Sequence, residues 1–189
     1  MRGEIDQGGG PVIRIVDYDP GWPGRFTEIG GALRRALGGV ALRIDHIGST
    51  SVPGLAAKPI IDIQVSVERL EPVAPFAEPL GRAGLVFRAD NPERTKRCFR
   101  EAPGQPRTHI HVRRTGSFSE QFALLFRDFL RADQGSVREY ESVKRALARR
   151  LGHDRQAYTD AKAEIFWKII QRADEWAQQR GWEPGPSDA

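Results

Sequence analysis

The chain has 189 residues, of which 39% are hydrophobic and 29% are charged, a balance typical of a folded globular protein with a sizeable core. No apolar run approaches the roughly 20 residues that a membrane-spanning helix needs, and the N-terminal stretch MRGEIDQGGGPV has no apolar signal core. A single cysteine, Cys98, excludes an internal disulfide and a cysteine-rich metal site, so we expect a cytoplasmic protein in a reducing compartment.

The net charge of +4 and the isoelectric point near 9.6 are mildly basic, and arginine is scattered along the chain. The densest clusters are RTKRCFR (94–100) and HVRR (111–114). A mild excess of this kind fits an anionic small-molecule substrate, with a solvated basic surface as the alternative. Nucleic-acid-binding proteins usually show longer basic runs, so we expect neither nucleic acid nor a membrane as partner. The oligomeric state stays open.

In chain order, the sequence predicts a polar leader, one helix, a mixed sheet and three further helices. Residues 1–11 are Gly-rich and polar, which favours a disordered leader. Apolar residues between Phe26 and Leu37 recur at spacings of three and four, which predicts a helix ending at Gly38. Five strands and one short Pro-interrupted helix are predicted next, in the segments VALRIDHIG, PIIDIQVSV, LEPVAPFAEPLGRAG (the helix), LVFRA, KRCFREA and RTHIHVRR.

Helical patterns dominate after Thr115. SFSE and SVRE both have the Ser-x-x-Glu pattern of a capping box, in which side chains satisfy free backbone N–H groups at a helix start. A third helix is predicted from near Asp154 to about Gln179, ended by Gly181. The predicted buried stripes of these helices are Phe122, Leu125, Phe126 and Phe129, then Tyr140, Val143, Leu147 and Leu151, and finally Tyr158, Ile165, Ile169 and Trp176.

Strands followed by helices indicate an α+β protein. No internal repeat divides the chain. We expect a single domain over residues 12–180, with a sheet core to about residue 115 and a helical part over 116–180, followed by a tail over 181–189.

One carboxylate, Asp62, interrupts the most strand-like segment, PIIDIQVSV. In an extended strand residues two apart share a face, so Ile61, Ile63 and Val65 point to the core while Asp62 and Gln64 point away. An isolated buried charge is very costly, so Asp62 must be exposed, paired or bound to a cation. A hydrogen-bonded structural role is the alternative to an active-site role.

Earlier in the chain, HIGSTS offers groups that bind phosphate. Backbone N–H groups and the hydroxyls of Ser49, Thr50 and Ser51 suit a phosphate, and Gly48 lets a ligand approach the backbone closely. A phosphate cradle beside a cation-binding carboxylate suits a metal–nucleotide complex. The same letters occur in many ordinary loops, so the pattern alone leaves both interpretations open.

The stretch DHIGSTSVPGLAAKPIIDI resembles the signature of the GrpB family, a branch of the nucleotidyltransferase superfamily with the DNA polymerase β-like fold. RTHIHV, LLFRDFLRA, YESVKRALA and YTDAKAEI also resemble that family, and the resemblance covers roughly residues 11–175. It implies a nucleotidyltransferase-like mixed sheet with a Gly-Ser turn at a helix start. It also implies a strand bearing acidic metal ligands and a C-terminal three-helix segment packed on the sheet.

The chain departs from the superfamily pattern at Gln64. Active nucleotidyltransferases typically carry an Asp-x-Asp pair and a third carboxylate on a later strand. Here Asp62 is followed by the neutral Gln64, and the later strand offers His109 and His111. Two imidazoles and one carboxylate suit Zn²⁺, Mn²⁺ or Fe²⁺ better than Mg²⁺, with surface or hydrogen-bonding histidines as the alternative. His46 is a candidate acid or base, or else forms a structural hydrogen bond.

Three more cations lie in the resembling segments. Lys58, at the entrance of the Asp62 strand, could reach a phosphate, and Arg127 could do so unless it forms an internal salt bridge. The wider superfamily often uses helical-domain lysines on the triphosphate, which implies that role for Lys162 unless it is merely solvated. The predicted site residues are Asp62 and His46 as catalytic groups; Gly48, Ser49, Thr50, Ser51, Lys58, Arg127 and Lys162 for nucleotide or phosphate; and Asp62, His109 and His111 for metal.

Two functions fit these residues best. The first is an enzyme that binds a nucleotide, or another phosphorylated or activated small molecule, with Mg²⁺, Mn²⁺ or Zn²⁺ and transfers a group from it. The second is a catalytically silent nucleotide-binding module that regulates a partner, and a nucleic-acid-modifying role is a third option. In each case we expect the side chains of Ser49, Asp62, His109 and His111 to face one cleft between the sheet and the C-terminal helices.

Overall fold

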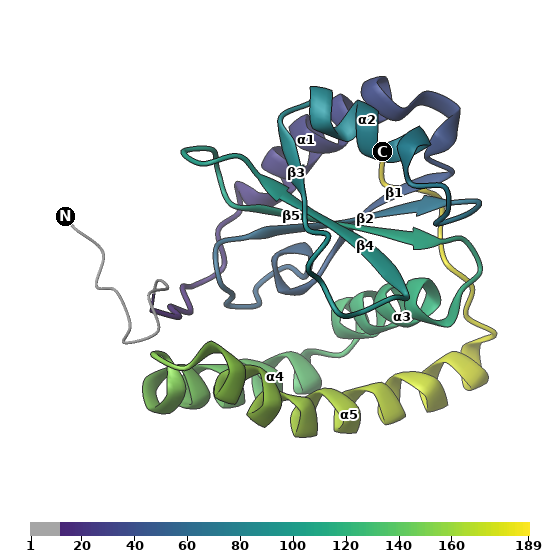
Figure 1. The fold of residues 1–189 in the computed structure, drawn as a ribbon. Coiled ribbons are helices and arrows are strands. Elements are labelled where there is room, and N and C mark those ends of the chain that lie inside the picture. Colours follow the sequence, from purple (N-terminus) through teal and green to yellow (C-terminus); the bar gives the residue numbers. More distant parts are fainter. Residues whose placement is uncertain (1–11) are drawn as a thin grey trace.

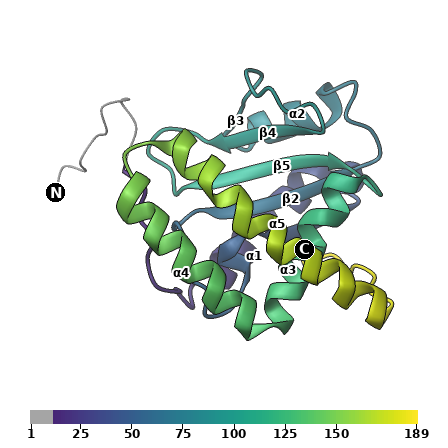
Figure 2. The same ribbon diagram turned by 90° about the horizontal axis from the view of Figure 1, so that it is seen from below.

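The computed structural model describes residues 12–189 and places one mixed β-sheet between two layers of helices (Figure 1). Helices α1 and α2 cover one face of the sheet, and α3, α4 and α5 lie on the other, as the view from below also shows (Figure 2). The predicted leader, residues 1–11, lies outside the described residues. The elements are α1 (Trp22–Leu37), β1 (Arg43–Ile47), the 3₁₀ turn η2 (Ser49–Ser51), β2 (Ile61–Val67), α2 (Ala74–Arg82), β3 (Leu85–Phe87), β4 (Lys96–Glu101), β5 (Thr108–Arg114), α3 (Phe118–Ala132), α4 (Gln134–Leu151) and α5 (Arg155–Arg180).

The five strands lie in the order β1-β2-β5-β4-β3. β2 and β5 pair in parallel, whereas β1 with β2, β5 with β4 and β4 with β3 pair antiparallel. In the parallel pair, Asp62 lies opposite His109 and Gln64 lies opposite His111. Polar residues of two strands that are far apart in the sequence therefore share one face of the sheet.

The alternation predicted for β2 is confirmed. Ile61, Ile63 and Val65 are buried against α1 and α2, in a core that also holds Phe99 and Phe76. Because neighbouring residues point to opposite faces, the residues between them face α3, α4 and α5. The core under α1 and α2 accounts for the apolar half of the strand, and the polar half faces the other helical layer.

One of the two predicted capping boxes is confirmed and the other is wrong. Ser117 begins α3, where its hydroxyl accepts from the N–H of Glu120, and the Glu120 carboxylate accepts from the N–H of Gly116. Helix α4 begins earlier than SVRE predicted, because the side chain of Asp133 accepts from the N–H of Ser136 at 2.7 Å. Ser136 is therefore buried inside the helix, where its hydroxyl accepts from Arg172 of α5.

Residues 181–189, predicted as a tail after the domain, run back along the outer edge of β1 (Figure 1). The Ala189 N–H donates to the carbonyl of Ile44, and the Asp188 carboxylate accepts from the N–H of His46 at 2.9 Å. This segment thus supplies hydrogen-bond partners to an edge strand that the sheet order leaves unpaired on one side. Among residues 12–189, none of the helices has the length and apolar character needed to cross a membrane.

Removing the observed cap of α4 should destabilise the protein. We expect Asp133→Ala to lower the free energy of unfolding by about 1 kcal/mol, because the N–H of Ser136 loses its side-chain acceptor. Urea denaturation followed by circular dichroism measures this difference. Glu175→Ala, an exposed change within α5, is the matched control and should stay within about 0.5 kcal/mol of the wild type. Equal midpoints for the Asp133 variant and the wild type would contradict the assignment of the cap.

Candidate functional site

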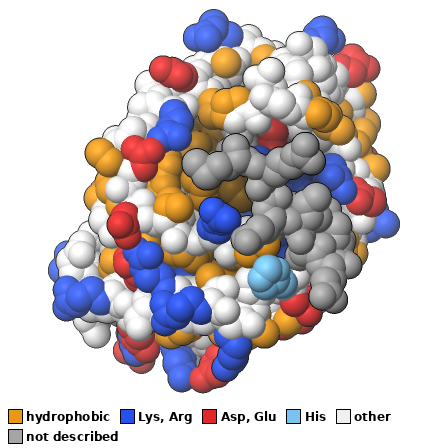
Figure 3. Space-filling model, turned by 90° about the vertical axis from the view of Figure 1, so that its left-hand side faces the viewer, with side chains coloured by type: hydrophobic (Ala, Val, Ile, Leu, Met, Phe, Trp, Pro, Cys, Tyr) orange, Lys and Arg blue, Asp and Glu red, His pale blue; other side chains and the backbone are white. Residues whose placement is uncertain are grey.

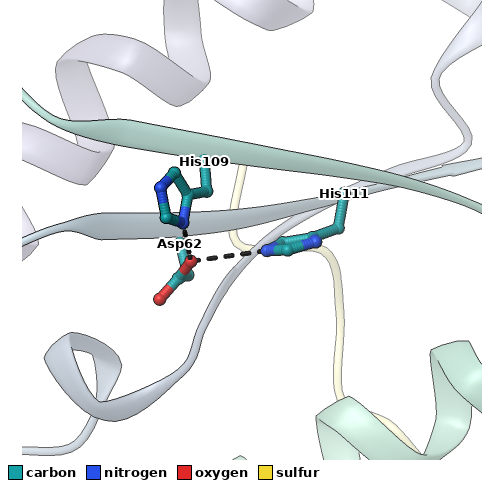
Figure 4. Close-up of side chains that lie close together, drawn as sticks. All are labelled: Asp62, His109 and His111. Carbon is teal, nitrogen blue, oxygen red and sulfur yellow. Dashed lines mark hydrogen bonds and ion pairs between the residues drawn. The ribbon is translucent and has the colours of Figure 1, made fainter. Parts of the chain in front are cut away.

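Asp62, His109 and His111 form one cluster on the face of the sheet that α3, α4 and α5 cover (Figure 4). Oδ1 of Asp62 lies 3.2 Å from Nδ1 of His109 and 3.3 Å from Nε2 of His111. One ligand atom from each of the three residues lies within 4.8 Å of the others. The parallel register of β2 and β5 produces the cluster, since it puts His109 opposite Asp62 and His111 two residues further on the same face.

The two imidazoles determine the charge state of the carboxylate. Burial alone would raise the pKa of Asp62, but hydrogen bonds from His109 and His111 outweigh burial and hold that pKa well below its usual range. Burial lowers the pKa of His111, and the neighbouring Asp62 only partly offsets this. The cluster therefore presents an ionised carboxylate beside a His111 imidazole that favours its neutral form, and these are the forms that bind metal ions.

The Gly-Ser turn touches the same carboxylate. Gly48 has a φ of 72°, and a Cβ atom placed on it would lie 2.8 Å from Oδ2 of Asp62. Both the backbone conformation and the space therefore require glycine here. The residue predicted to let a ligand approach the backbone instead leaves room for Asp62 itself.

Ser49 lies beside a small cavity of about 190 Å³ that cations surround. Nζ of Lys144 donates to Oγ of Ser49 at 3.1 Å and to the carbonyl of Ala56 at 2.5 Å. Lys144 is only 3% exposed, and burial of its charged ammonium group is unfavourable. Other charged residues that line this cavity are Asp62, Lys58, Arg155 and Lys162. The four basic residues of this cavity are Lys58, Lys144, Arg155 and Lys162. Among residues 12–189, no carboxylate lies within ion-pair distance of their side chains, so the cavity is suited to an anion.

Mutual repulsion and burial weaken the protonation of these lysines. Burial and the charge of Lys162 lower the pKa of Lys144 to about 7, with Glu141 acting in the opposite direction and Arg145 and Lys58 in the same direction. Burial and Lys162 likewise lower the pKa of Lys58 to about 8. The Lys58 and Lys144 ammonium groups lie over the rings of Tyr158 and Tyr140, which partly replaces lost hydration. An anion in the cavity would favour the charged forms.

A larger cavity of about 860 Å³ adjoins the same cluster on the side of α3 and α5. Asp62, Ser49 and Lys162 line both cavities. The larger one is walled by aromatic side chains, namely Phe118, Phe122, Phe126, Tyr140, Phe166 and Trp167. The four residues expected to face one cleft are divided between two adjoining cavities, with Ser49, Asp62 and His111 along the larger cavity and Ser49, Asp62 and His109 along the smaller one.

Two other predicted residues of the HIGSTS segment do not face these cavities. His46 lies on the opposite face of the sheet, stacked on Phe26 with ring centroids 4.8 Å apart, and burial lowers its pKa to about 4. Its Nε2 lies 3.0 Å from the Thr50 hydroxyl, so the predicted acid or base forms a structural hydrogen bond instead. The Ser51 hydroxyl donates to the carbonyl of Gly48 at 2.6 Å and stabilises the turn. Thr50 does line the smaller cavity, but its hydroxyl donates to the Ile60 carbonyl.

Arg127 also lies away from both cavities. It is 3% exposed and donates to Asp128 at 2.7 Å, to Asp188 at 2.8 Å and to the carbonyl of His46 at 3.2 Å. The internal salt bridge, left open as the alternative, is therefore what the structure shows. Arg127 thus joins α3 to residues 181–189 and to β1.

Sequence patterns missed four cations at the cavities: Lys144, Arg155, Arg113 and Arg114. One signal was available for Lys144, which falls four residues after Tyr140 on the predicted buried stripe of its helix. A lysine inside an apolar stripe marks a buried cation with a polar partner. Arg113 follows the same two-residue alternation as His109 and His111, and its Nη1 donates to Oε1 of Gln64 at 2.5 Å. No local pattern distinguished Arg155.

On one face of the molecule, the visible Lys and Arg side chains do not form a single patch. On the face shown in Figure 3, the coloured Lys and Arg side chains are interspersed with acidic and apolar ones, and apolar side chains gather around a hollow near the centre. Proteins that bind nucleic acid typically cluster such side chains along one face. The expectation that nucleic acid is not a partner stays a prediction.

Comparisons with known proteins bear on the family and the fold. The family model described as GrpB protein matches residues 12–172. The crystal structure of the conserved protein GrpB from Enterococcus faecalis is 32% identical, has a TM-score of 0.78 and covers 90% of this chain and 100% of that chain. The structure of Cid1 in complex with its short product ApU is 16% identical, has a TM-score of 0.50 and covers 72% of this chain and 43% of that chain. The last likeness concerns the fold alone and confirms the predicted nucleotidyltransferase-like sheet.

A longer protein also contains a similar segment. The dephospho-CoA kinase of Mycolicibacterium paratuberculosis is 38% identical over 198 residues, which cover 91% of this chain but 48% of that protein. The chain thus spans about half the length of the dephospho-CoA kinases that it matches. The similarity shows which segment the two proteins share. The activity of the whole kinase is a property of that longer protein.

The buried lysine should make stability depend on pH. Unfolded lysine has a pKa of 10.5 and Lys144 about 7, so the unfolded chain binds more protons between these values and the free energy of unfolding rises with pH across that window. Between about pH 6.5 and about pH 8.5, Lys144 should contribute a rise of about 1–2 kcal/mol. Urea denaturation at both pH values should show that Lys144→Met removes this rise. Lys168→Met, at an exposed position of α5, should keep it; equal slopes for both variants would contradict the burial of the charge.

An added methyl group at the turn should disturb the cluster. We expect Gly48→Ala to lower the free energy of unfolding by about 1–3 kcal/mol, because alanine is strained at this φ and its Cβ meets the Asp62 carboxylate. Thermal or urea denaturation measures the loss. Gly39→Ala is the control, since nothing lies within 4 Å of a Cβ at that position. A Gly48 variant as stable as the control would show that the turn is not constrained as described.

Proposed function

The chain belongs to the GrpB family, and from that premise we propose that it binds a phosphorylated small molecule, such as a nucleotide, with one divalent metal ion and transfers a group from it. The observation that carries the proposal is the position of the Asp62 cluster between a cation-lined cavity and an aromatic-walled one. A phosphorylated ligand would place its phosphates in the cation-lined cavity and would contact the metal ion where the two cavities meet. Positioning and charge are the means by which proteins usually accelerate phosphoryl and nucleotidyl transfer.

The phosphate subsite would consist of Ser49 and the basic residues Lys58, Lys144, Lys162 and Arg155. Because Lys144 donates to the Ser49 oxygen, the Ser49 hydroxyl hydrogen stays available to donate to a phosphate oxygen. Four cations without a carboxylate partner among residues 12–189 can balance the charge of a di- or triphosphate. Three of them, Lys144, Arg155 and Lys162, lie on α4 and α5, so the ligand would bridge sheet and helices.

The metal subsite would be Asp62, His109 and His111. Their donor atoms already lie near one another, and the donor set of two imidazoles and one carboxylate suits Zn²⁺, Mn²⁺ or Fe²⁺ better than Mg²⁺. Histidine ligands usually donate their second N–H to an acceptor. His111 has Sγ of Cys98 at 4.0 Å from its Nδ1, whereas Nε2 of His109 is buried and has no partner among residues 12–189. A bound metal ion would supply Lewis-acid charge at the junction of the two cavities.

A second candidate is a catalytically silent binding module, and the pairing of Gln64 with Arg113 favours it. Gln64 takes the place where a second carboxylate would stand, and its amide oxygen is occupied by a guanidinium. A site of this kind can bind a metal–phosphate ligand through Asp62 without the second anionic ligand that a two-metal mechanism uses. Product formation separates the two candidates, because both require binding.

The metal proposal predicts a specific set of losses. We expect Asp62→Asn, His109→Ala and His111→Ala each to weaken Zn²⁺ or Mn²⁺ binding at least about tenfold, as removal of one of three ligands should. Isothermal titration of metal-free protein measures the affinity, and Mg²⁺ should bind more weakly than either ion. His153→Ala, an exposed histidine outside the cluster, is the matched control. Unchanged Zn²⁺ affinity in all three variants would refute the site.

The phosphate subsite and the reaction are tested together. We expect Lys58→Ala and Lys162→Ala to weaken the binding of pyrophosphate and ATP, whereas Lys168→Ala, also on α5 but paired with Glu164 at the surface, should not. Metal-dependent turnover of ATP or of dephospho-CoA, lost in Asp62→Asn, would support group transfer. Binding of these ligands without turnover would support the silent module. If neither pyrophosphate nor ATP binds with or without metal, both candidates fail.

A further inference from the structure

Arg113, on the floor of the larger cavity, has hydrogen-bond donors that the protein does not use. A guanidinium carries five N–H donors. Among residues 12–189, the one hydrogen bond from the Arg113 side chain runs from Nη1 to Oε1 of Gln64, and the buried Nε has no partner. A buried cationic donor without a partner is costly, so its environment is suited to an acceptor that is not part of the described chain.

The carboxylates near Arg113 do not neutralise it directly. Glu93, Asp62 and Glu120 influence its charge through space, but within the described residues none lies within the 4 Å of an ion pair. Glu93 is itself paired with Lys96 at 2.5 Å. Arg113 therefore faces the cavity as a cation with a planar fork of donors, the group that best matches a carboxylate.

The walls above Arg113 are aromatic and partly open. Phe122 packs against Phe118, Phe166 and Trp167 with ring centroids 5.3, 5.3 and 5.7 Å apart. Phe118 is 77% exposed and Trp167 is 55% exposed, which is unusual for such large apolar side chains on a helical surface. An apolar ligand body placed against this wall would remove it from water.

We propose that the larger cavity is a second substrate subsite for a small carboxylic acid with an aromatic or otherwise apolar body. Its carboxylate binds Arg113, and its body packs against Phe122 and Trp167. A phosphate head fits the smaller cavity better, because Lys58, Lys144 and Arg155 face that cavity alone, whereas Arg113 and Arg114 share the lining of the larger one with the carboxylate of Glu93. The inference deepens the proposed function by naming the class of its second substrate, although binding of the acid does not itself require the phosphate subsite.

The position of the two cavities explains why the pair would be useful. Ser49, Asp62 and Lys162 line both of them, so an acid in the larger cavity and a phosphate in the smaller one would lie on either side of the same residues. Holding two reactants in neighbouring subsites lowers the entropic cost of their encounter. The aromatic wall would select the acid by its body and Arg113 by its charge.

Phenylpropionate is the probe, and its neutral amide, phenylpropionamide, is the matched ligand control. In isothermal titration with the whole protein, we expect the acid to bind with a Kd of about 1 mM, near the limit for so small a ligand. The amide should bind at least about tenfold more weakly, because it cannot form the charge-assisted pair with Arg113. Trp167→Ala and Arg113→Met should each weaken acid binding about tenfold or more. Arg94→Ala and Val86→Ala, exposed positions away from the aromatic wall, should not change it.

Two readouts keep the inference separate from the proposed function. Circular dichroism and the unchanged binding of pyrophosphate show whether Arg113→Met has disturbed the fold, and Trp167→Ala tests the wall at an exposed position. Acid and pyrophosphate that bind together without competition support two subsites. Equal binding of acid and amide, or no binding of the acid, overturns the inference. Displacement of the acid by adenosine assigns the cavity to a nucleoside and also overturns it. If the acid binds but neither pyrophosphate nor ATP does, the proposed function fails and this inference stands.

Discussion

A carboxylate can lie on the helix-facing side of β2 because two imidazoles of β5 meet it there. An isolated charge between a sheet and a helical layer would be unfavourable by several kcal/mol. The parallel register puts His109 opposite Asp62 and His111 one step further along the same face, and both reach one carboxylate oxygen. Gly48 completes this arrangement, because a side chain at its position would occupy the space of that carboxylate. The turn, the two strands and the cluster therefore constrain one another.

The helical layer provides positive charge opposite this face of the sheet. Lys144 reaches across from α4 to the Ser49 hydroxyl and the Ala56 carbonyl, while Glu141 of the same helix accepts from the Ala56 N–H. These contacts fix α4 to the segment that connects η2 with β2. They also hold a lysine where burial and neighbouring cations disfavour its charge. Such an arrangement is unfavourable without a counter-ion and becomes favourable when an anion enters, which is a common compromise between stability and function.

The larger cavity follows a different principle. Its wall is apolar and its floor carries Arg113, with Arg114 and Glu93 also in the lining, so it would select ligands by shape and by charge. Gln64, whose oxygen accepts from Arg113, connects this floor to the strand of Asp62. Gln64 thus puts a neutral side chain beside Asp62 on β2 and also positions a cation. The two cavities differ in chemistry although three residues line both.

Helix α4 and β1 show how far local patterns reach. The apolar stripe around Tyr140 and Leu147 predicted the helix correctly, but its start depends on Asp133, whose oxygen reaches the N–H of Ser136 first. His46 and Ser51 are next to the Gly-Ser turn in sequence, yet the pairing of β1 with β2 puts His46 opposite Ile63, on the core face. Residues that lie close to the Gly-Ser turn in the sequence therefore do not all line the candidate site.

The sequence by itself determined the order of helix, strands and C-terminal helices, and it determined that Asp62 points away from the core and that His109 and His111 share a face. These properties follow from the two-residue period of a strand and the 3.6-residue period of a helix, which act over a few neighbouring residues. Only the tertiary structure decided that β5 lies beside β2 and that Lys144 contacts Ser49. The reason is physical: strand pairing and helix docking depend on contacts between segments far apart in the chain, and no local period carries that information.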